Sequence, residues 1–194
     1  MMAFTHILVG ILLSAGISQL AGLSVTPFMI AGAVGGLFPD IDLLFTHRKT
    51  FHYPFIFPIL TIISVAIYAV VQLETLLFLT AFMAAAAAHS AMDVLGGGKE
   101  MRPWRETDDR AVYDHLRQRW VKPLRLFYDG CLPDLILAII SAVGILYAVS
   151  SGADVIISLL VVLAIIYTLL RRVVTQWIPE DYATFSSYIQ HKIR

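Results

Sequence analysis

The chain has 194 residues, of which 58% are hydrophobic and only 14% are charged. An average soluble domain is about 45–50% apolar and about 25% charged, so this composition excludes an ordinary soluble enzyme and a disordered chain. Lys and Arg number 14, as do Asp and Glu, and the formal net charge of zero creates no global field that would attract nucleic acid. The mean hydropathy of +0.77 indicates a polytopic membrane protein. The single cysteine, Cys131, excludes an intrachain disulfide and a cysteine-cage zinc site.

Apolar segments follow one another along the chain, and most are long enough to cross about 30 Å of hydrocarbon as helices. They cover residues 4–23, 25–38, 53–73, 75–95, 132–149 and 153–170. The second segment is short, which predicts a thin span, a tilted span that includes residues 39–44, or a re-entrant half-helix. We therefore expect an all-α membrane bundle of about six helices in a single domain, residues 1–194.

Polar residues divide this domain into four parts. Residues 1–98 carry four apolar segments, residues 99–131 form a long polar loop, residues 132–170 form a helix pair, and residues 171–194 form a tail. Both charge signs are frequent in residues 108–119, which predicts a short helix there. Aromatic residues in the loop are typical of a membrane interface.

The basic residues are confined to one set of connections. Every Lys and Arg falls in residues 46–52, 96–131 or 171–194. If all the apolar segments cross, these stretches lie on one side with the N-terminus, and the tight hairpins on the other side carry no basic residue. The positive-inside rule then predicts a cytoplasmic (inner) membrane protein with both termini and the long loop in the cytoplasm.

Small residues recur at helical spacing on the first two segments and near the end of the fourth. They are Gly10, Ser14, Ser18, Gly22, Gly32, Gly36 and the alanines at positions 84–88. Because small side chains let helix backbones approach closely in lipid, we expect the first, second and fourth segments to pack as one cluster.

Histidines and aspartates from four places in the sequence converge on the cytoplasmic boundary of this topology. They are His6, Asp40, Asp42, His47, His52, His89 and Asp93. Imidazole and carboxylate ligands suit zinc, manganese or iron. The pattern predicts a site for one or two divalent ions, with zinc as the first choice and manganese or iron as alternatives.

Two pairs of residues support this hypothesis. His89 and Asp93 are four residues apart and share one helix face inside an apolar segment, where ionisable groups are costly unless paired or liganded. The alternative for this pair is a buried hydrogen bond. Asp40 and Asp42 follow Pro39, which favours a break in the second segment. Acids at a helix C-terminus oppose the helix dipole, and a metal ion would compensate them.

The loop of residues 47–52 combines two imidazoles with two cations. His47 and His52 can both reach one site from a loop, whereas Arg48 has no lone pair for a metal and suits an anionic group such as phosphate. Arg48 and Asp42 are the predicted catalytic residues, with Asp42 as a bridging ligand or base. The alternative is a basic membrane anchor, which explains Arg48 and Lys49 but not the two histidines.

Three other ionisable residues are set apart from this site. His115 and His191 are expected in solvent. Asp134 is expected to serve as a charge at a helix N-terminus, with a contact to the metal ligands as the alternative.

The combination of motifs resembles the membrane-bound metal-dependent hydrolase family, the YdjM-like inner-membrane proteins. The matching elements are Thr5-His6, Leu37-Phe38-Pro39-Asp40-Ile41-Asp42, His47-Arg48-Lys49-Thr50-Phe51-His52 and His89-Ser90-Ala91-Met92-Asp93. The resemblance covers residues 5–98 and implies a metal-dependent hydrolase. The family's third element reads His-Arg-Gly-x-Thr-His-Ser, and this chain keeps both histidines but lacks the Thr and Ser that flank the second.

The sequence therefore predicts a metal-dependent hydrolase at the cytoplasmic leaflet. Its depth in the membrane favours a lipid or lipid-linked phosphoester as substrate, with Arg48, and Arg102 or Arg105 from the loop, neutralising the phosphate. Alternatives from other classes are a metal or proton transporter, a haem protein with His6 and His89 as axial ligands, and a non-catalytic protein whose metal staples helices.

Overall fold

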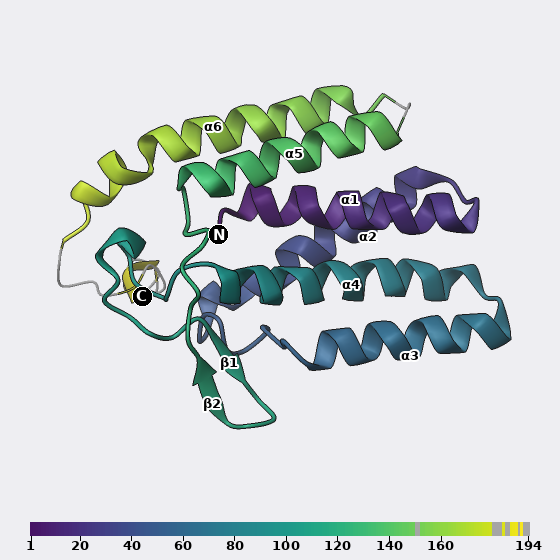
Figure 1. Cartoon of the computed structure of the whole chain (residues 1–194), viewed down its shortest axis with the longest axis horizontal. Helices are drawn as coiled ribbons and strands as arrows, with labels where there is room; N and C mark the ends of the chain where they lie inside the picture. Colours follow the sequence, from purple (N-terminus) through teal and green to yellow (C-terminus); the bar gives the residue numbers. More distant parts are fainter. Residues whose placement is uncertain (150–151, 180–183, 185–186, 190, 192–194) are drawn as a thin grey trace.

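A computed structural model of the chain describes residues 1–149, 152–179, 184, 187–189 and 191 (Figure 1). Its elements are α1 (Ala3–Ala21), α2 (Val25–Leu37), the 3₁₀ helix η1 (Phe38–Leu44), α3 (Ile56–Val71), α4 (Glu74–Leu95), the 3₁₀ turn η2 (Pro103–Arg105), β1 (Val112–Asp114), β2 (Arg119–Val121), α5 (Leu132–Ala148) and α6 (Asp154–Gln176). The helices lie side by side in one bundle, and the connection between α4 and α5 covers one of its ends.

The predicted all-α membrane fold is confirmed, because each apolar segment forms a helix. Residues Ala3–Ala21, Val25–Leu44, Glu74–Leu95 and Asp154–Gln176 are long and apolar enough to cross a membrane. The apolar helices α3 and α5 are shorter, at 16 and 17 residues. Sixteen helical residues rise about 24 Å, which suits a slightly thinned bilayer or interfacial ends.

The second apolar segment extends beyond the break predicted at Pro39. The chain continues from α2 into η1 without leaving helical geometry, so the apolar unit runs from Val25 to Leu44 and has 20 residues. In Figure 1 it runs obliquely behind α1 and α4. Of the three predicted alternatives, this arrangement matches the tilted segment that includes residues 39–44.

The predicted cluster of α1, α2 and α4 is confirmed by how closely their backbones approach. A Cβ built on Gly32 would clash with the carbonyl oxygen of Gly10, and one on Gly36 would clash with the carbonyl oxygen of His6. A Cβ on Gly35 would clash with the carbonyl oxygen of Phe82 on α4. The glycines of α2 therefore bring η1 and its aspartates next to α1 and α4.

The helix expected in residues 108–119 is wrong, because this stretch forms a β-hairpin. Tyr113 pairs with Trp120 across the antiparallel strands, and their ring centroids are 5.3 Å apart. The Asp114 carboxylate accepts hydrogen bonds from the amides of Leu116 and Arg117, which favours a turn over a helix. Aromatic and β-branched residues on both strands prefer this pleated pairing.

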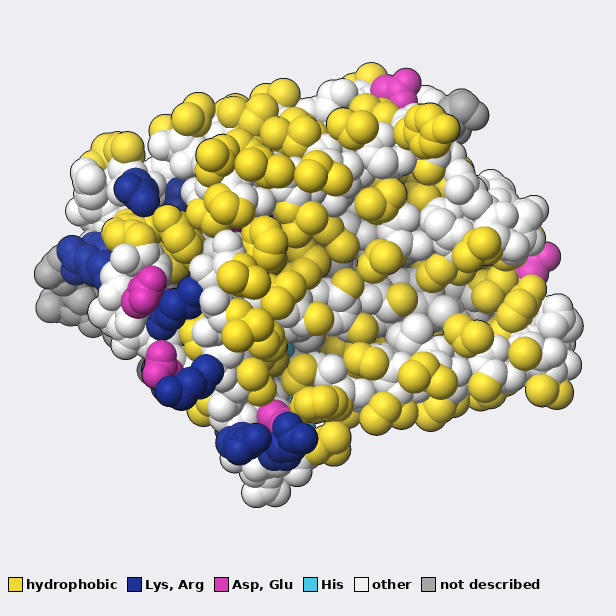
Figure 2. Space-filling view, viewed as in Figure 1, with side chains coloured by type: hydrophobic (Ala, Val, Ile, Leu, Met, Phe, Trp, Pro, Cys, Tyr) yellow, Lys and Arg dark blue, Asp and Glu magenta, His cyan; other side chains and the backbone are white. Residues whose placement is uncertain are grey.

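Charged side chains are distributed unevenly over the surface. On the face shown in Figure 2, Lys and Arg gather at the end formed by the loop and the hairpin, and hydrophobic side chains cover the helices. The basic residues thus mark one end of the bundle, which is the end that holds the predicted metal ligands.

Candidate metal centre

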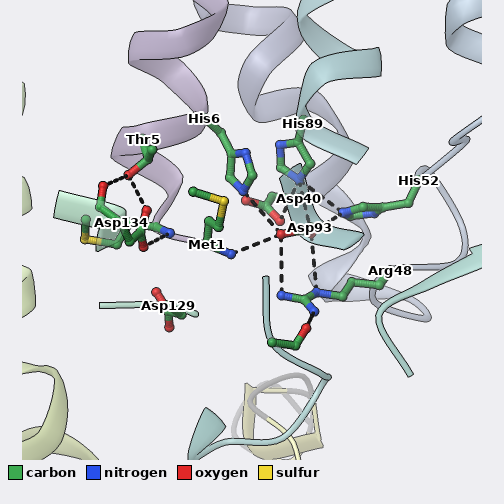
Figure 3. A network of polar contacts seen from close by, with 12 residues as sticks. Met1, Thr5, His6, Asp40, Arg48, His52, His89, Asp93, Asp129 and Asp134 are labelled. Atoms are coloured by element: carbon green, nitrogen blue, oxygen red, sulfur yellow. Dashed lines mark hydrogen bonds and ion pairs between the residues drawn. The ribbon is translucent and has the colours of Figure 1, made fainter. Parts of the chain in front are cut away.

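The predicted ligands come together where α1, η1 and α4 meet the loop after η1 (Figure 3). The close backbone packing at Gly36 brings η1 and the first turns of α1 to the last turns of α4. The loop that follows η1 then folds back over them.

Four of the seven predicted residues form a cluster that could hold a metal ion. They are Asp40, His52, His89 and Asp93, whose ligand atoms all lie within 4.8 Å of one another. The Nε2 atom of His52 is 3.1 Å from Nε2 of His89 and 3.1 Å from Oδ2 of Asp93. The Nε2 atom of His89 is 3.5 Å from Oδ1 of Asp40. Ligands of a tetrahedral zinc ion lie about 3.3 Å apart, so these separations fit such an ion.

The outer nitrogens of the two clustered imidazoles are held by acceptors. His89 Nδ1 donates to the Gly36 carbonyl at 2.6 Å, and His52 Nδ1 donates to Oδ2 of Asp42 at 2.9 Å. In the neutral rings both Nε2 atoms therefore carry lone pairs, and these face each other. Either a proton on one ring or a metal ion must lie between them. Metal-bound histidines ordinarily have such an acceptor on the second nitrogen.

Asp42 lies outside the cluster and is fully buried. Its carboxylate bonds Nδ1 of both His47 and His52, each at 2.9 Å. It also accepts hydrogen bonds from the backbone amides of Arg48, Lys49 and Phe51. Asp42 thus fixes the course of the loop and the direction of the His52 ring, and His47 lies behind His52, with ring centroids 5.6 Å apart.

His6 lies against the cluster from the α1 side. Its ring stacks on His89 with centroids 3.7 Å apart, and its Nε2 is 3.4 Å from Oδ1 of Asp93. Nδ1 of His6 is buried and has no hydrogen-bond partner among the described residues. His6 therefore directs one nitrogen at a carboxylate of the cluster.

Arg48 is buried beside the cluster with a backbone in the left-handed region, at a φ of 61°. Its guanidinium donates to the carbonyls of Gly97 and Gly98, at 2.6 and 3.0 Å, and Nε is 3.3 Å from Oδ2 of Asp93. Asp93 is thus the acidic partner of Arg48, which reaches across to the end of α4.

Contacts that the sequence did not reveal hold the start of α1 in place. The amino group of Met1 donates to Oδ1 of Asp93 at 3.0 Å. Asp134, in the first turn of α5, accepts hydrogen bonds from the amide of Met2 at 2.9 Å and the hydroxyl of Thr5 at 2.7 Å. Asp134 has the expected place at a helix start, but it also fixes the residue before His6. A buried acid in an apolar helix was the only sequence signal for this contact.

A second ion pair lies at the same end of the bundle. Oδ2 of Asp129 accepts from Nε of Arg171 at 2.7 Å and from the Tyr167 hydroxyl at 2.8 Å. Burial acts to raise the pKa of Asp129, but Arg171, the amino group of Met1 and the Tyr167 hydroxyl together hold this pKa below its ordinary value. The pair joins the loop before α5 to α6.

The cluster opens into a cavity of about 600 Å³. Asp40, His47, Arg48 and Asp93 line one side of it, and residues of α6 line another. The Asp40 side chain keeps 17% of its surface exposed, whereas those of His52 and His89 are fully covered. The cluster is thus accessible from the side of Asp40.

Comparison with known protein families matches residues 1–178 to the family described as YdjM inner membrane protein. The chain belongs to this family. The predicted resemblance to YdjM-like proteins is confirmed, and the match extends past residue 98 to include the loop, α5 and most of the described part beyond them. No curated protein and no solved structure matches the chain. It is an inner membrane protein with several apolar helices and a cluster that could hold a metal ion.

The two histidines that were not assigned to the site, His115 and His191, lie outside this cluster. His115 is half-buried in the hairpin, where its ring centroid is 4.7 Å from that of Tyr53. It is therefore not simply solvated, as expected, but packs against an aromatic ring. His191 is exposed, as expected.

Proposed function

We propose that this YdjM family member is a metal-dependent hydrolase that acts at the cytoplasmic leaflet on a lipid or lipid-linked phosphoester. The observation that carries the proposal is the pair of facing Nε2 atoms, 3.1 Å apart, between two carboxylates and beside a cavity. This donor set is one that zinc, manganese or iron accepts, with zinc as the first choice.

Each residue has a distinct role in this proposal. Asp40, His52, His89 and Asp93 hold the ion, and His6 lies close enough to Asp93 to complete a larger coordination shell or serve a second ion. The sequence suggested Asp42 as a bridging ligand or base and His47 as a ligand. The contacts of Asp42 favour a positioning role, since both of its oxygens already accept hydrogen bonds from His47, His52 and the loop.

The chemistry follows from the donor set and the cavity. A divalent ion in such a site activates water near neutral pH and polarises a phosphoryl oxygen. Arg48 lies at the cavity wall and would pair with the anionic group of the substrate, because its planar guanidinium suits phosphate oxygens. Asp93, which holds Arg48 at 3.3 Å, keeps this cation in place before the substrate arrives.

A helix-stapling metal is the second candidate, because four protein donors can close a tetrahedral site completely. The cavity beside Asp40 and Asp93 favours the hydrolase instead, since a purely structural ion needs no access. A transporter is a weaker alternative, because it would need polar groups along a path through the membrane. Among the described residues, the acidic ones at the far end of the bundle are only Glu74 and Asp154, at the starts of α4 and α6, and they do not form a second layer of ligands.

The first experiment is elemental analysis of detergent-purified protein, followed by hydrolysis assays with bis(p-nitrophenyl) phosphate. We expect about one or two divalent ions per chain, and loss of both metal and turnover in Asp40→Asn. Asp109→Asn is the matched control, because Asp109 is 66% exposed and lies outside the cluster. A folded preparation with no metal would contradict the proposal.

Cobalt substitution separates the hydrolase from the staple. Added phosphate should change the visible spectrum of the cobalt protein if the ion has an open position facing the cavity. A tetrahedral spectrum that phosphate leaves unchanged would identify a closed, structural ion.

A further inference from the structure

The cavity beside the cluster is mostly apolar and has one long wall. That wall is a stripe on α6 in which successive members are three or four residues apart, so they share one helix face. Its hydrophobic members are Leu163, Ile166, Leu170 and Val174, and Ile178 continues the row just past the end of α6. Phe4 of α1 and Leu43 of η1 line the cavity on the bundle side.

The stripe is only partly covered by protein. Leu163, Ile166, Leu170 and Val174 are 37%, 46%, 49% and 45% exposed, although they line a cavity. Contact between α1 and α6 at this level includes the rings of Phe4 and Tyr167, whose centroids are 6.3 Å apart. The cavity therefore continues along α6, an apolar helix long enough to cross the membrane, at the end nearest the cluster.

The opposite end of the cavity is polar and is lined by three basic side chains, those of Arg48, Lys99 and Arg171. Arg48 pairs with Asp93, and Arg171 pairs with Asp129. Lys99 also lines the cavity, but it forms no ion pair among the described residues, and its ammonium lies 4.7 Å from the Trp120 ring centroid. Asp108 and Asp42 act on Lys99 electrostatically, but neither forms an ion pair with it, so its ammonium can still contact an anionic group that enters the cavity.

We propose that this cavity binds a membrane lipid with a phosphate head, placing its hydrocarbon chain along the α6 stripe and its head between Lys99 and the cluster. The proposal rests on the proposed function for what happens to the head, but the chain site is formed by the α6 stripe with Phe4 and Leu43 and includes none of the metal ligands. A cavity of about 600 Å³ lies within the usual range for small-ligand sites.

Charge and continuity favour a lipid over a soluble phosphate ester. A soluble ester needs polar contacts around its whole length, whereas the stripe presents four hydrophobic side chains on one face of α6, with Ile178 just beyond them. The polar groups lie where Asp40, Asp93 and the loop meet α6 near Arg171, which is the end where the basic residues of the surface gather (Figure 2). A lipid in the adjacent leaflet has this same order of polar and apolar parts.

The test compares octyl phosphate with ethyl phosphate on the purified full-length protein in lipid nanodiscs. Titration calorimetry, corrected with empty nanodiscs, gives the ratio of their affinities. Each buried methylene contributes roughly fourfold in affinity for a probe that comes from water. We expect octyl phosphate to bind at least tenfold more tightly, because both probes share one head group.

Substitutions on α6 locate the chain. Ile166→Trp and Leu170→Trp each fill part of the cavity, and each should reduce the octyl-to-ethyl ratio at least fivefold. Leu169→Trp is the matched control, because Leu169 is 70% exposed and does not line the cavity. Lys99→Gln should weaken both probes equally and leave the ratio unchanged, which separates the head from the chain.

The outcomes distinguish this proposal from the proposed function. A ratio near one in the unmodified protein, or an equal ratio in the cavity variants and in Leu169→Trp, would overturn the lipid site. A protein that keeps the ratio but neither binds metal nor hydrolyses bis(p-nitrophenyl) phosphate would overturn the hydrolase alone. Because the ratio is measured at a constant head group, the chain site is tested in either case.

Discussion

His47 and His52 have similar sequence positions but different surroundings. Both donate from Nδ1 to Asp42, yet only Nε2 of His52 lies within 3.1 Å of His89 and Asp93. The sequence treated both as ligands, because either imidazole can reach a site from a loop. Oδ1 of Asp42 holds His47 and Oδ2 holds His52, and only the His52 ring is placed beside His89 and Asp93.

This difference predicts unequal effects on metal binding. His52→Ala should abolish stoichiometric metal binding. His47→Ala removes only a hydrogen bond to Asp42, the residue that positions His52, and should weaken metal affinity about 10–100-fold. Chelator competition on purified protein measures both. His115→Ala is the control, since His115 lies in the hairpin outside the cluster. Equal losses in the two variants would mean that His47 is itself a ligand.

Arg48 should act on the substrate and not on the metal. Arg48→Ala should retain its metal and, with a phosphoester substrate, raise KM or lower kcat, because a guanidinium cannot ligate an ion. Arg48→Lys should restore activity only partly, since an ammonium lacks the two-point contact. Metal analysis together with kinetics checks this, and Arg117→Ala, 63% exposed, is the control.

A different result would redefine the loop. Arg48 also holds the carbonyls of Gly97 and Gly98, so its removal leaves acceptors unpaired. Loss of metal from Arg48→Ala, with metal retained in both histidine variants, would mean that the loop is a basic anchor folded by ion pairs. The site would then consist of His6, Asp40, Asp42, His89 and Asp93.

Among the elements, α2 determines how closely the ligands approach. Its glycines allow α1 and α4 to contact its backbone, and the Gly36 carbonyl also holds the His89 ring at 2.6 Å. The spacing of small residues was enough to predict that these helices pack together. It could not show that a glycine carbonyl would orient a ligand, because that contact depends on the rotation of α2.

Gly36→Ala tests this element. The added Cβ would clash with the His6 carbonyl, so α1 and α2 must separate, at an expected cost of about 1–3 kcal/mol in stability. Metal affinity should fall as well, since His6 and His89 both move. Gly16→Ala is the matched control on α1, because its Cβ meets nothing within 4 Å. Thermal unfolding in detergent measures the stability, and metal titration measures the affinity. Equal stability and equal metal affinity in the two variants would contradict this prediction.

The hairpin shows where sequence patterns were insufficient at this scale. Mixed charges in residues 108–119 are compatible with a solvated helix, but Asp114 caps a turn and Tyr113 pairs with Trp120. The amide of Tyr113 also donates to the Arg48 carbonyl at 2.9 Å. That long-range bond joins the hairpin to the ligand loop, and no local pattern encodes it.

For the whole molecule, the apolar segments were predictable because hydrocarbon demands long, self-satisfied helices. Each predicted segment corresponds to one helix, and only the ends differ. The depth of the ligands in the membrane was also predictable, because the order of the spans places all of them at the same membrane boundary. The cavity was not, because it depends on the angle at which α6 leaves α1 and α5, which no hydropathy pattern specifies.

The orientation of the bundle can be predicted from its charge distribution. The metal ligands lie at the same end as the loop and hairpin, where Lys and Arg gather, and the basic residues of the sequence all fall in connections expected on that side (Figure 2). The positive-inside rule therefore predicts that the cluster faces the cytoplasm. Reporter fusions within residues 108–119 and after residue 194 should read cytoplasmic, whereas fusions at Glu74 and Gly152 should read periplasmic.

These fusions also decide which leaflet supplies the lipid. The hairpin and the ligand loop are joined at Tyr113 and Arg48, so the reading at residues 108–119 reports directly on the side of the cluster. A periplasmic reading both there and after residue 194 would invert the molecule. The cluster and the α6 stripe would remain intact, because neither depends on orientation, but the substrate would have to come from the outer leaflet of the inner membrane.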